Sequence, residues 1–384
     1  MSSFFPCIRP IRFLASIKQY HHAYSTTAQH PLTPSLKILF CSKHFSEGKP
    51  WEPLANTTFR PHHIRTCTAA DLHQTLSTWR PDVLVPWWHT IDHHLLDRAS
   101  SLTLIHQFGV GLDNVDVPAA TRNGIWVTRL PANGTGNADT VAEHAVLLML
   151  ALSRRLPLAV QVVRNGGPFG QPYGMGMIEK TVCIVGLGDI GRALASRLST
   201  WRMRITAVRH RPELGTPPEL RDAIDIVYPT SELHRAIAEA DYVVSAVKYD
   251  RARNRRLFDA AAFKAMKPGA IFVNVARGGL VDEEALADAL ETGSVGGAGL
   301  DVFEREPLDT RSRLLALSNV IATPHSAGVT DSFYEMGARV FAENVARFAR
   351  GEMVKYAVNR PETPRKALRE MGEEDDAVVL SIND

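Results

Sequence analysis

Val182-Cys-Ile-Val-Gly186-Leu-Gly188-Asp-Ile-Gly191 decides the fold of this 384-residue chain, because it predicts a strand, a tight turn and the start of a helix in one line. This order is typical of the GxGxxG dinucleotide-binding motif. Gly186 would make the turn, Gly188 would let a pyrophosphate approach, and Gly191 would let the helix pack on the strand. Free N–H groups at the helix N-terminus would bind the phosphates. The residues of this turn that we expect at the cofactor are Gly186, Gly188, Asp189, Ile190 and Gly191.

The end of the next predicted strand distinguishes NAD from NADP. In NAD-binding proteins a carboxylate at this place accepts hydrogen bonds from the ribose hydroxyls. Here Val208 is followed by Arg209-His210-Arg211, and no carboxylate appears before Glu213. Two guanidinium groups suit a 2′-phosphate dianion, because they bind it through charge-assisted hydrogen bonds. The sequence therefore favours NADP(H), bound by Arg209, His210 and Arg211, and leaves NAD(H) open.

Alternating strands and helices around this motif predict an α/β fold with a doubly wound parallel sheet. Its strands are expected near residues 182–185, 204–208, 224–228, 241–246, 270–275, 296–301 and 319–322. Earlier in the chain, three apolar runs suit the buried strands of a smaller α/β unit, at residues 37–41, 82–86 and 102–106. A long helix is expected from about Ala138 to Arg155, a Gly- and Pro-rich linker over residues 165–176, and a final helix over residues 331–350.

The two ends of the chain differ from the rest in composition. Residues 1–30 are basic and contain no carboxylate, and the first acidic residue of the chain is Glu47. Such a segment is typical of a mitochondrial transit peptide, the alternative being an extension without that function. Residues 361–384 carry the run Glu373-Glu-Asp-Asp376 and are predicted to form a flexible, solvated tail.

Composition excludes no class of partner but favours a small molecule. The net charge of +2 gives no field that would recruit nucleic acid or a membrane surface. The longest uncharged apolar run, Ala145 to Leu152, is far shorter than the ~18 residues of a membrane span. The four cysteines have neither CxxC nor paired spacing, so we expect no disulfide framework and no metal site; they are Cys7, Cys41, Cys67 and Cys183.

Three further strand ends carry residues suited to chemistry. Arg277 follows the strand near 270–275, Glu306 follows the strand near 296–301, and His325 follows the strand near 319–322. Because the carboxyl ends of parallel strands face one ligand crevice, these three side chains should converge on one rim. Taken singly, Arg277 could be a salt-bridge partner, Glu306 a solvated acid and His325 a capping residue.

Together with the GxGxxG turn, several motifs give the chain a specific resemblance. They are Gly109-Val-Gly-Leu-Asp-Asn-Val-Asp116, Val141-Ala-Glu-His144, Asn274-Val-Ala-Arg-Gly278, Leu300-Asp-Val-Phe-Glu-Arg-Glu-Pro307 and Thr323-Pro-His325. From about residue 36 to residue 360 the chain resembles the D-isomer-specific 2-hydroxyacid dehydrogenase family. The resemblance implies a Rossmann domain, residues 136–330, inserted into a flavodoxin-like substrate domain of residues 36–135 and 331–360. It also implies a cleft that closes between the two, and usually a homodimer.

The resemblance implies a reduction of a 2-oxo acid to the D-2-hydroxy acid. Arg277 would hold the substrate carboxylate and polarise the 2-oxo group, His325 would donate the proton, and Glu306 would hold the imidazole. The backbone of Val110 and Gly111 resembles the family's carboxylate-binding loop. Further cofactor contacts implied by position are Val247, Val275, Ala276, Asp301 and Gly328, with Asp301 near the nicotinamide carboxamide. Trp87 and Trp88 follow a predicted strand and would either line the substrate pocket or pack between the domains.

One segment departs from the family pattern. After the strand near 241–246, the family usually has a proline-containing turn and a threonine, whereas this chain has Val247-Lys248-Tyr249-Asp250-Arg-Ala-Arg253. The resemblance therefore places this loop by position alone.

Within the family, the arginines after the second strand resemble those of glyoxylate and hydroxypyruvate reductases, which lean toward NADPH. Two other functions stay open. A formate dehydrogenase shares Val141-Ala-Glu-His144 but replaces the acid before the proline with glutamine, so Glu306-Pro307 speaks against it. A dinucleotide-sensing corepressor would use the same fold and triad for binding rather than turnover.

Overall fold

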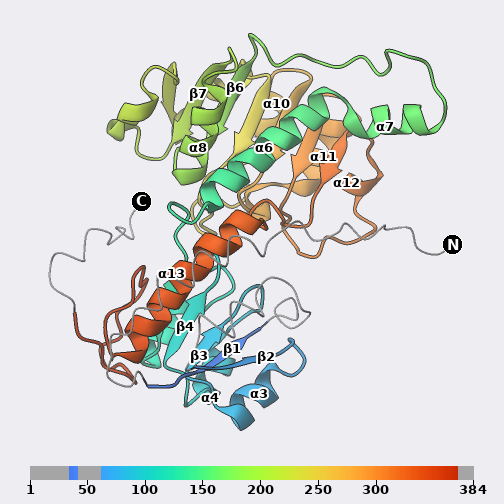
Figure 1. Ribbon diagram of the computed structural model, residues 1–384. Coiled ribbons are helices and arrows are strands. Elements are labelled where there is room, and N and C mark those ends of the chain that lie inside the picture. Colours follow the sequence, from blue (N-terminus) through green and yellow to red (C-terminus); the bar gives the residue numbers. More distant parts are fainter. Residues whose placement is uncertain (1–33, 42–61, 371–384) are drawn as a thin grey trace, which may run out of the picture.

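The structure is a computed structural model that describes residues 34–41 and 62–370. It contains two separate parallel sheets, and we call the parts around them the five-strand domain and the seven-strand domain (Figure 1). The expected transit segment at residues 1–30 and the acidic run at 373–376 lie outside the described residues.

The seven-strand sheet confirms the predicted doubly wound fold. Its strands are β6 (Thr181–Val185), β7 (Arg204–Arg209), β8 (Ile226–Pro229), β9 (Tyr242–Ser245), β10 (Ala270–Asn274), β11 (Val295–Leu300) and β12 (Val320–Ala322). Their order is β12-β11-β10-β9-β6-β7-β8, and all neighbours are parallel. The chain winds outward from β6 in one direction and then from β9 in the other. This reversal leaves a ligand crevice at the carboxyl ends of β6 and β9.

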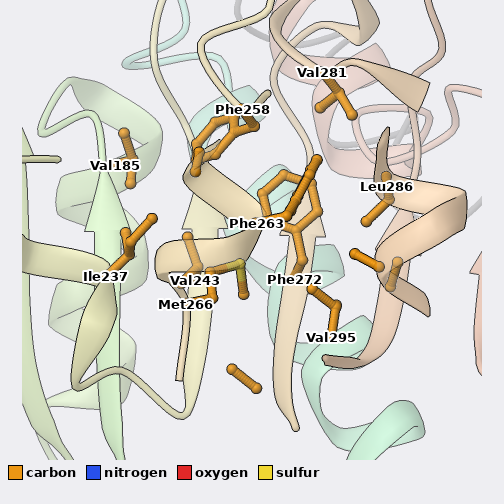
Figure 2. Close-up of a cluster of buried hydrophobic side chains, with 14 of the residues drawn as sticks. Val185, Ile237, Val243, Phe258, Phe263, Met266, Phe272, Val281, Leu286 and Val295 are labelled. Carbon is orange, nitrogen blue, oxygen red and sulfur yellow. The ribbon is translucent and has the colours of Figure 1, made fainter. Parts of the chain in front are cut away.

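Helices cover both faces of this sheet: α6 (Asn137–Ser153), α8 (Asp189–Leu198), α9 (Leu233–Ala238), α10 (Ala260–Ala265), α11 (Glu283–Glu291) and α12 (Arg313–Ala316). One face packs on α6 and α8, and the other on α9 to α11. Figure 2 shows this second core, where the rings of Phe258 and Phe263 meet that of Phe272 at 4.9 and 5.4 Å. The strands are apolar on both sides because both of their faces are buried.

The five-strand sheet has the order β2-β1-β3-β4-β5, which is the flavodoxin-like order. Its strands are β1 (Lys37–Phe40), β2 (His63–Thr66), β3 (Val83–Val85), β4 (Leu104–Gln107) and β5 (Trp126–Arg129), accompanied by α3 (Leu72–Trp79), α4 (His93–Arg98) and α5 (Val117–Arg122). Strands β2 and β5 were not predicted from the sequence. Both are edge strands that mix apolar with polar or charged residues, so neither has the continuous apolar run that marked the central strands.

The long helix α13 (Asp331–Ala349) returns the chain to the five-strand domain, where Phe333, Phe341 and Phe348 join its core. The expectation of a flexible tail from residue 361 is wrong for residues 361–370, which pack against this domain. The backbone N–H of Arg365 donates to Gly124 O at 2.8 Å, and the indole of Trp126 donates to Lys366 O at 3.0 Å. The composition of the acidic run further on gave no sign of these contacts, which involve residues far away in the sequence.

A short helix, α7 (Leu156–Arg164), was also not predicted. It follows α6 after Arg155, whose φ of 49° separates the two helices, and it projects from the body of the molecule (Figure 1). No single helix in the described part of the chain is long and apolar enough to span a membrane. Helices α6 and α7 pass that test as a pair, but they are bent by 55° at the break. The described cysteines Cys41, Cys67 and Cys183 are free.

Candidate active site

A cleft of about 2610 Å³ lies between the carboxyl ends of the two sheets and contains the predicted site residues. The five-strand domain lines it with the loops after β3 and β4, and the seven-strand domain lines it with the loops after β6, β7, β9, β10, β11 and β12. The predicted residues that line it are Trp87, Trp88, Val110, Gly111, Gly186, Gly188, Asp189, Ile190, Arg209, His210, Arg211, Val247, Val275, Ala276, Arg277, Asp301, Glu306, His325 and Gly328. Gly191 lies just behind this surface, buried in α8.

The glycine turn after β6 has the geometry that a dinucleotide needs. Gly186 has a φ of 107°, and a Cβ there would lie 2.6 Å from the backbone of Ala246. Gly191 is packed so closely against the carbonyl of Gly186 that no side chain fits. A Cβ on Gly188, in contrast, would meet nothing within 4 Å, so this backbone is open on the cleft side. The turn therefore leaves room for a pyrophosphate at the N-terminus of α8.

Positive charge gathers at the end of β7. Burial lowers the pKa of Arg209, and the nearby guanidinium groups of Arg192 and Arg211 lower it further. Arg209 donates to Gly215 O at 2.7 Å, which fixes its guanidinium at the rim of the cleft. Arg192 was not considered in the sequence analysis; it lies within 3.8 Å of Glu219 and 3.7 Å of Asp189. An anion placed among these arginines would relieve their mutual repulsion.

The atypical loop after β9 also borders the cofactor crevice. Its first residue, Val247, abuts Gly186, and the ring of Tyr249 packs over Gly279. Asn254 closes the loop, donating to Lys248 O at 2.8 Å and accepting from Asp250 N at 2.7 Å. The loop thus occupies the expected position, and the two hydrogen bonds of Asn254 stabilise it where the family usually has a proline-containing turn.

His325 and Glu306 form a direct pair. His325 Nδ1 lies 2.8 Å from Glu306 Oε2, and Phe303 N donates to Glu306 Oε1 at 2.9 Å. Burial alone would raise the pKa of Glu306. That pKa is nevertheless held below its ordinary value by the hydrogen bond to His325, the charge on His325, the N–H of Phe303 and the charge on Arg277. Glu306 is therefore an anion, and it orients the imidazole so that Nε2 is left for the cleft.

A buried network holds the His325 loop in an unusual conformation. The φ of His325 is 51°, in the left-handed region that non-glycine residues rarely adopt. Asp301 accepts hydrogen bonds from Thr323 Oγ1 at 2.6 Å, Ser326 N at 2.9 Å and Ala327 N at 3.0 Å. His144 on α6 adds a bond to Thr323 at 2.9 Å. Asp301 thus anchors the histidine loop, in addition to lining the cleft where the nicotinamide contact is expected.

Arg277 reaches across the cleft to the five-strand domain. Its Nε donates to Asp113 Oδ2 at 2.8 Å, and its Nη1 donates to Ala276 O at 2.7 Å. The guanidinium lies directly against Gly111, where a Cβ would collide with it. Asp113 belongs to the motif Gly109–Asp116, but its partner could not be predicted from the sequence, because Arg277 is far away in the chain. This contact brings the predicted arginine and the predicted carboxylate-binding loop together.

Hydrogen bonds from two side chains of the five-strand domain hold the loop after β4. Arg129, at the end of β5, donates to Val110 O at 2.8 Å, and Gln107 donates to Gly111 O at 3.1 Å. Within the described part of the chain, the N–H groups of Val110 and Gly111 donate to no protein acceptor. They are therefore available for an anion. Arg129 was not predicted as a site residue, because the strand β5 that carries it was not predicted.

The two tryptophans have different surroundings. Trp87 is 6% exposed and stacks on Tyr334, with ring centroids 6.0 Å apart and an interplanar angle of 9°. Trp88 is 54% exposed, and its ring lies 4.5 Å from that of His325. Trp87 is thus mainly a packing residue of the five-strand domain, whereas Trp88 forms the wall of the cleft beside the histidine.

Comparison with known proteins agrees with this geometry. Residues 146–327 match the model of the D-isomer-specific 2-hydroxyacid dehydrogenase NAD-binding domain. The chain is 36% identical to the glyoxylate reductase of Pyrococcus furiosus over 278 residues, which cover 70% of this chain and 80% of that protein. The chain belongs to the D-isomer-specific 2-hydroxyacid dehydrogenase family.

The chain is also similar to D-3-phosphoglycerate dehydrogenases and to solved structures of the family. The chain is 35% identical over 272 residues to the D-3-phosphoglycerate dehydrogenase of Archaeoglobus fulgidus, which covers 71% of this chain but 50% of that protein. The chain thus spans about half the length of the phosphoglycerate dehydrogenases it matches. A solved glyoxylate reductase from Paecilomyes thermophila superimposes with a TM-score of 0.70 and 26% identity, over 85% of this chain and 98% of that one.

Proposed function

We propose that the protein is an NAD(P)H-dependent reductase of a small 2-oxo acid, of the glyoxylate or hydroxypyruvate kind, that forms the D-2-hydroxy acid. One observation carries this proposal: the His325–Glu306 pair and Arg277 line the same cleft as the open glycine turn. A carboxylate partner for the histidine favours a reductase over a formate dehydrogenase. The large ring of Trp88 lines the cleft beside His325, and a bulky wall at this place favours a substrate with a short side chain.

The residues present fit a nicotinamide dinucleotide, because Gly188 faces open space at the N-terminus of α8. When bound, the reduced nicotinamide supplies the hydride. The backbone N–H groups of Val110 and Gly111, with Arg277, would hold the substrate carboxylate. Arg277 would also stabilise negative charge on the 2-oxo oxygen, and His325 would donate its Nε2 proton to that oxygen. Glu306 lies 2.8 Å from Nδ1 and thereby orients the imidazole for this transfer.

Loss of NADPH or NADH absorbance on addition of a 2-oxo acid tests the proposal. The panel should contain glyoxylate, hydroxypyruvate, pyruvate and a larger 2-oxo acid, with formate and NAD(P)⁺ in a separate assay. We expect the highest kcat/KM for the shortest acids, although one methylene shifts selectivity by only ~1–3 kcal/mol. Tight dinucleotide binding with no turnover of any acid would instead support the corepressor alternative.

We further propose that NADPH is the preferred cofactor, on the strength of the arginine cluster at the end of β7. The double substitution Arg209→Gln with Arg211→Gln should raise the KM for NADPH by about 10- to 100-fold, because two charge-assisted bonds to the 2′-phosphate are lost. The KM for NADH should stay within about threefold, as it has no such phosphate. Arg235→Gln, a surface arginine paired with Glu232, serves as the control. Equal effects on both cofactors, or a wild-type preference for NADH, would reverse the assignment.

We also propose that the protein forms a homodimer, and the exposed apolar residues of α7 support this proposal. None of its residues is buried; Val163 is 80% exposed and Leu156 47%. Apolar side chains gathered on a projecting helix are typical of an interface, and a second copy of the chain can bury them symmetrically. We expect Val163→Lys to lower the molecular mass in sedimentation equilibrium toward that of a monomer, and Ile226→Lys on the edge strand β8 to leave it unchanged. Equal masses for the two variants would place the interface elsewhere.

A further inference from the structure

Trp88 touches the candidate proton donor from the opposite side of the cleft. Its ring lies 4.5 Å from the imidazole of His325, at an interplanar angle of 54°. Trp88 belongs to the five-strand domain and His325 to the seven-strand domain. We propose that Trp88 is a positioning residue for His325, which holds the imidazole and favours its protonated form when the two domains are together. This inference rests on the proposed function.

The position of Trp88 is built into the five-strand domain. Trp87, with a φ of 57°, turns the chain at this point and is anchored by its stacking on Tyr334. The carbonyl of Trp87 accepts bonds from both Gln107 Nε2 and Asn114 Nδ2, each at 2.9 Å. Asn114 also donates to His89 O at 2.6 Å. The residues on both sides of Trp88 are thus fixed, so its large ring stays in the cleft although it is half exposed.

The two contacts of the imidazole are complementary. Glu306 Oε2 lies 2.8 Å from Nδ1, and the ring of Trp88 lies 4.5 Å from the imidazole ring at an interplanar angle of 54°. An indole attracts a cation within about 6 Å of its ring centroid, so this ring stabilises the imidazolium relative to the neutral imidazole. The bond to Glu306 uses Nδ1 and leaves Nε2 available. Because the two partners come from different domains, the proton donor is fully supported only in the closed cleft.

Other charged and titratable groups line the same cleft or bond to the histidine loop, and replacing Trp88 changes none of these side chains. They are Glu306 and Asp301 after β11, His144 on α6, Arg277 after β10, Asp113 after β4 and Tyr334 on α13. A change in the pH profile of a Trp88 variant therefore reports on the ring itself.

The test compares Trp88→Ala, Trp88→Phe and the wild type, with Trp201→Phe as a control for loss of an exposed tryptophan outside the cleft. For Trp88→Ala, we expect the pH above which kcat/KM for 2-oxo acid reduction declines to fall by about 0.5 unit, and kcat above that pH to fall by about three- to fivefold. Trp88→Phe should recover at least half of the shift, because it keeps an aromatic face. The KM for NADPH should not change.

A titration of the His325 imidazole by NMR in the NADP⁺-bound protein provides a readout independent of turnover. We expect the ring to lose its proton at lower pH in Trp88→Ala than in the wild type. If Trp88 is only a wall of the pocket, substrate KM and side-chain selectivity will change while both pH midpoints stay at their wild-type values, and the inference is then wrong. If the wild type reduces no 2-oxo acid, the proposed function fails, and the NMR titration still decides whether Trp88 acts on His325.

Discussion

Replacing Arg277 with alanine is expected to lower kcat/KM for the 2-oxo acid by about 10³-fold or more, with a rise in KM as well as a fall in kcat. The guanidinium lies against Gly111, at the loop whose free N–H groups face the cleft. It would bind the substrate carboxylate in the ground state and stabilise the growing charge on the 2-oxo oxygen in the transition state. Both interactions are lost together in the alanine variant. Steady-state kinetics with saturating NADPH would measure the two effects.

Arg277→Lys is the matched control for charge. Lysine keeps a positive charge but loses the planar fork, so it cannot bind the substrate carboxylate through two parallel hydrogen bonds. We expect it to recover part of the activity lost in Arg277→Ala. The partner left behind, Asp113, is half exposed and stays solvated, so NADPH affinity and the circular dichroism spectrum should be those of the wild type. Retention of activity within tenfold by Arg277→Ala would remove this residue from the site.

The second large effect is expected for His325→Ala, which should lower kcat by about 10²–10⁴-fold and leave substrate KM within a few-fold. The reason is that the proton to the 2-oxo oxygen would then have to come from water. Near-normal turnover of this variant across pH would show that another group donates the proton.

Glu306→Gln is the matched comparison, since an amide oxygen can still accept from Nδ1 without the negative charge. Its kcat should lie between those of the wild type and His325→Ala. Because the pKa of Glu306 lies below its ordinary value, the contribution of the carboxylate is present above the ordinary glutamate pKa. It is lost only as pH falls through the lowered value. The difference between wild type and Glu306→Gln should therefore vanish at the acid end of the profile, below the lowered pKa of Glu306.

Local sequence was sufficient for features that depend on neighbouring residues. The strand, turn and helix around Gly186 could be predicted because a φ of 107° and a close backbone approach admit only glycine. The central strands could be predicted because burial on both faces demands a continuous apolar run. The edge strands β2 and β5 carry mixed residues, and only their pairing with neighbouring strands makes them regular. The packed segment 361–370 likewise depends on contacts with distant parts of the chain.

The sequence by itself determined the doubly wound fold, the glycine turn and the residue types for the chemistry, since each follows from a short motif or from the strand period. Only the tertiary structure decided which residues contact them. Asp113 accepts a hydrogen bond from Arg277, Arg129 donates one to Val110 O, and the ring of Trp88 contacts that of His325. Each of these pairs joins residues from separate loops or from opposite domains. Their contacts depend on how the two sheets are placed relative to one another, and no local pattern in the sequence predicts that placement.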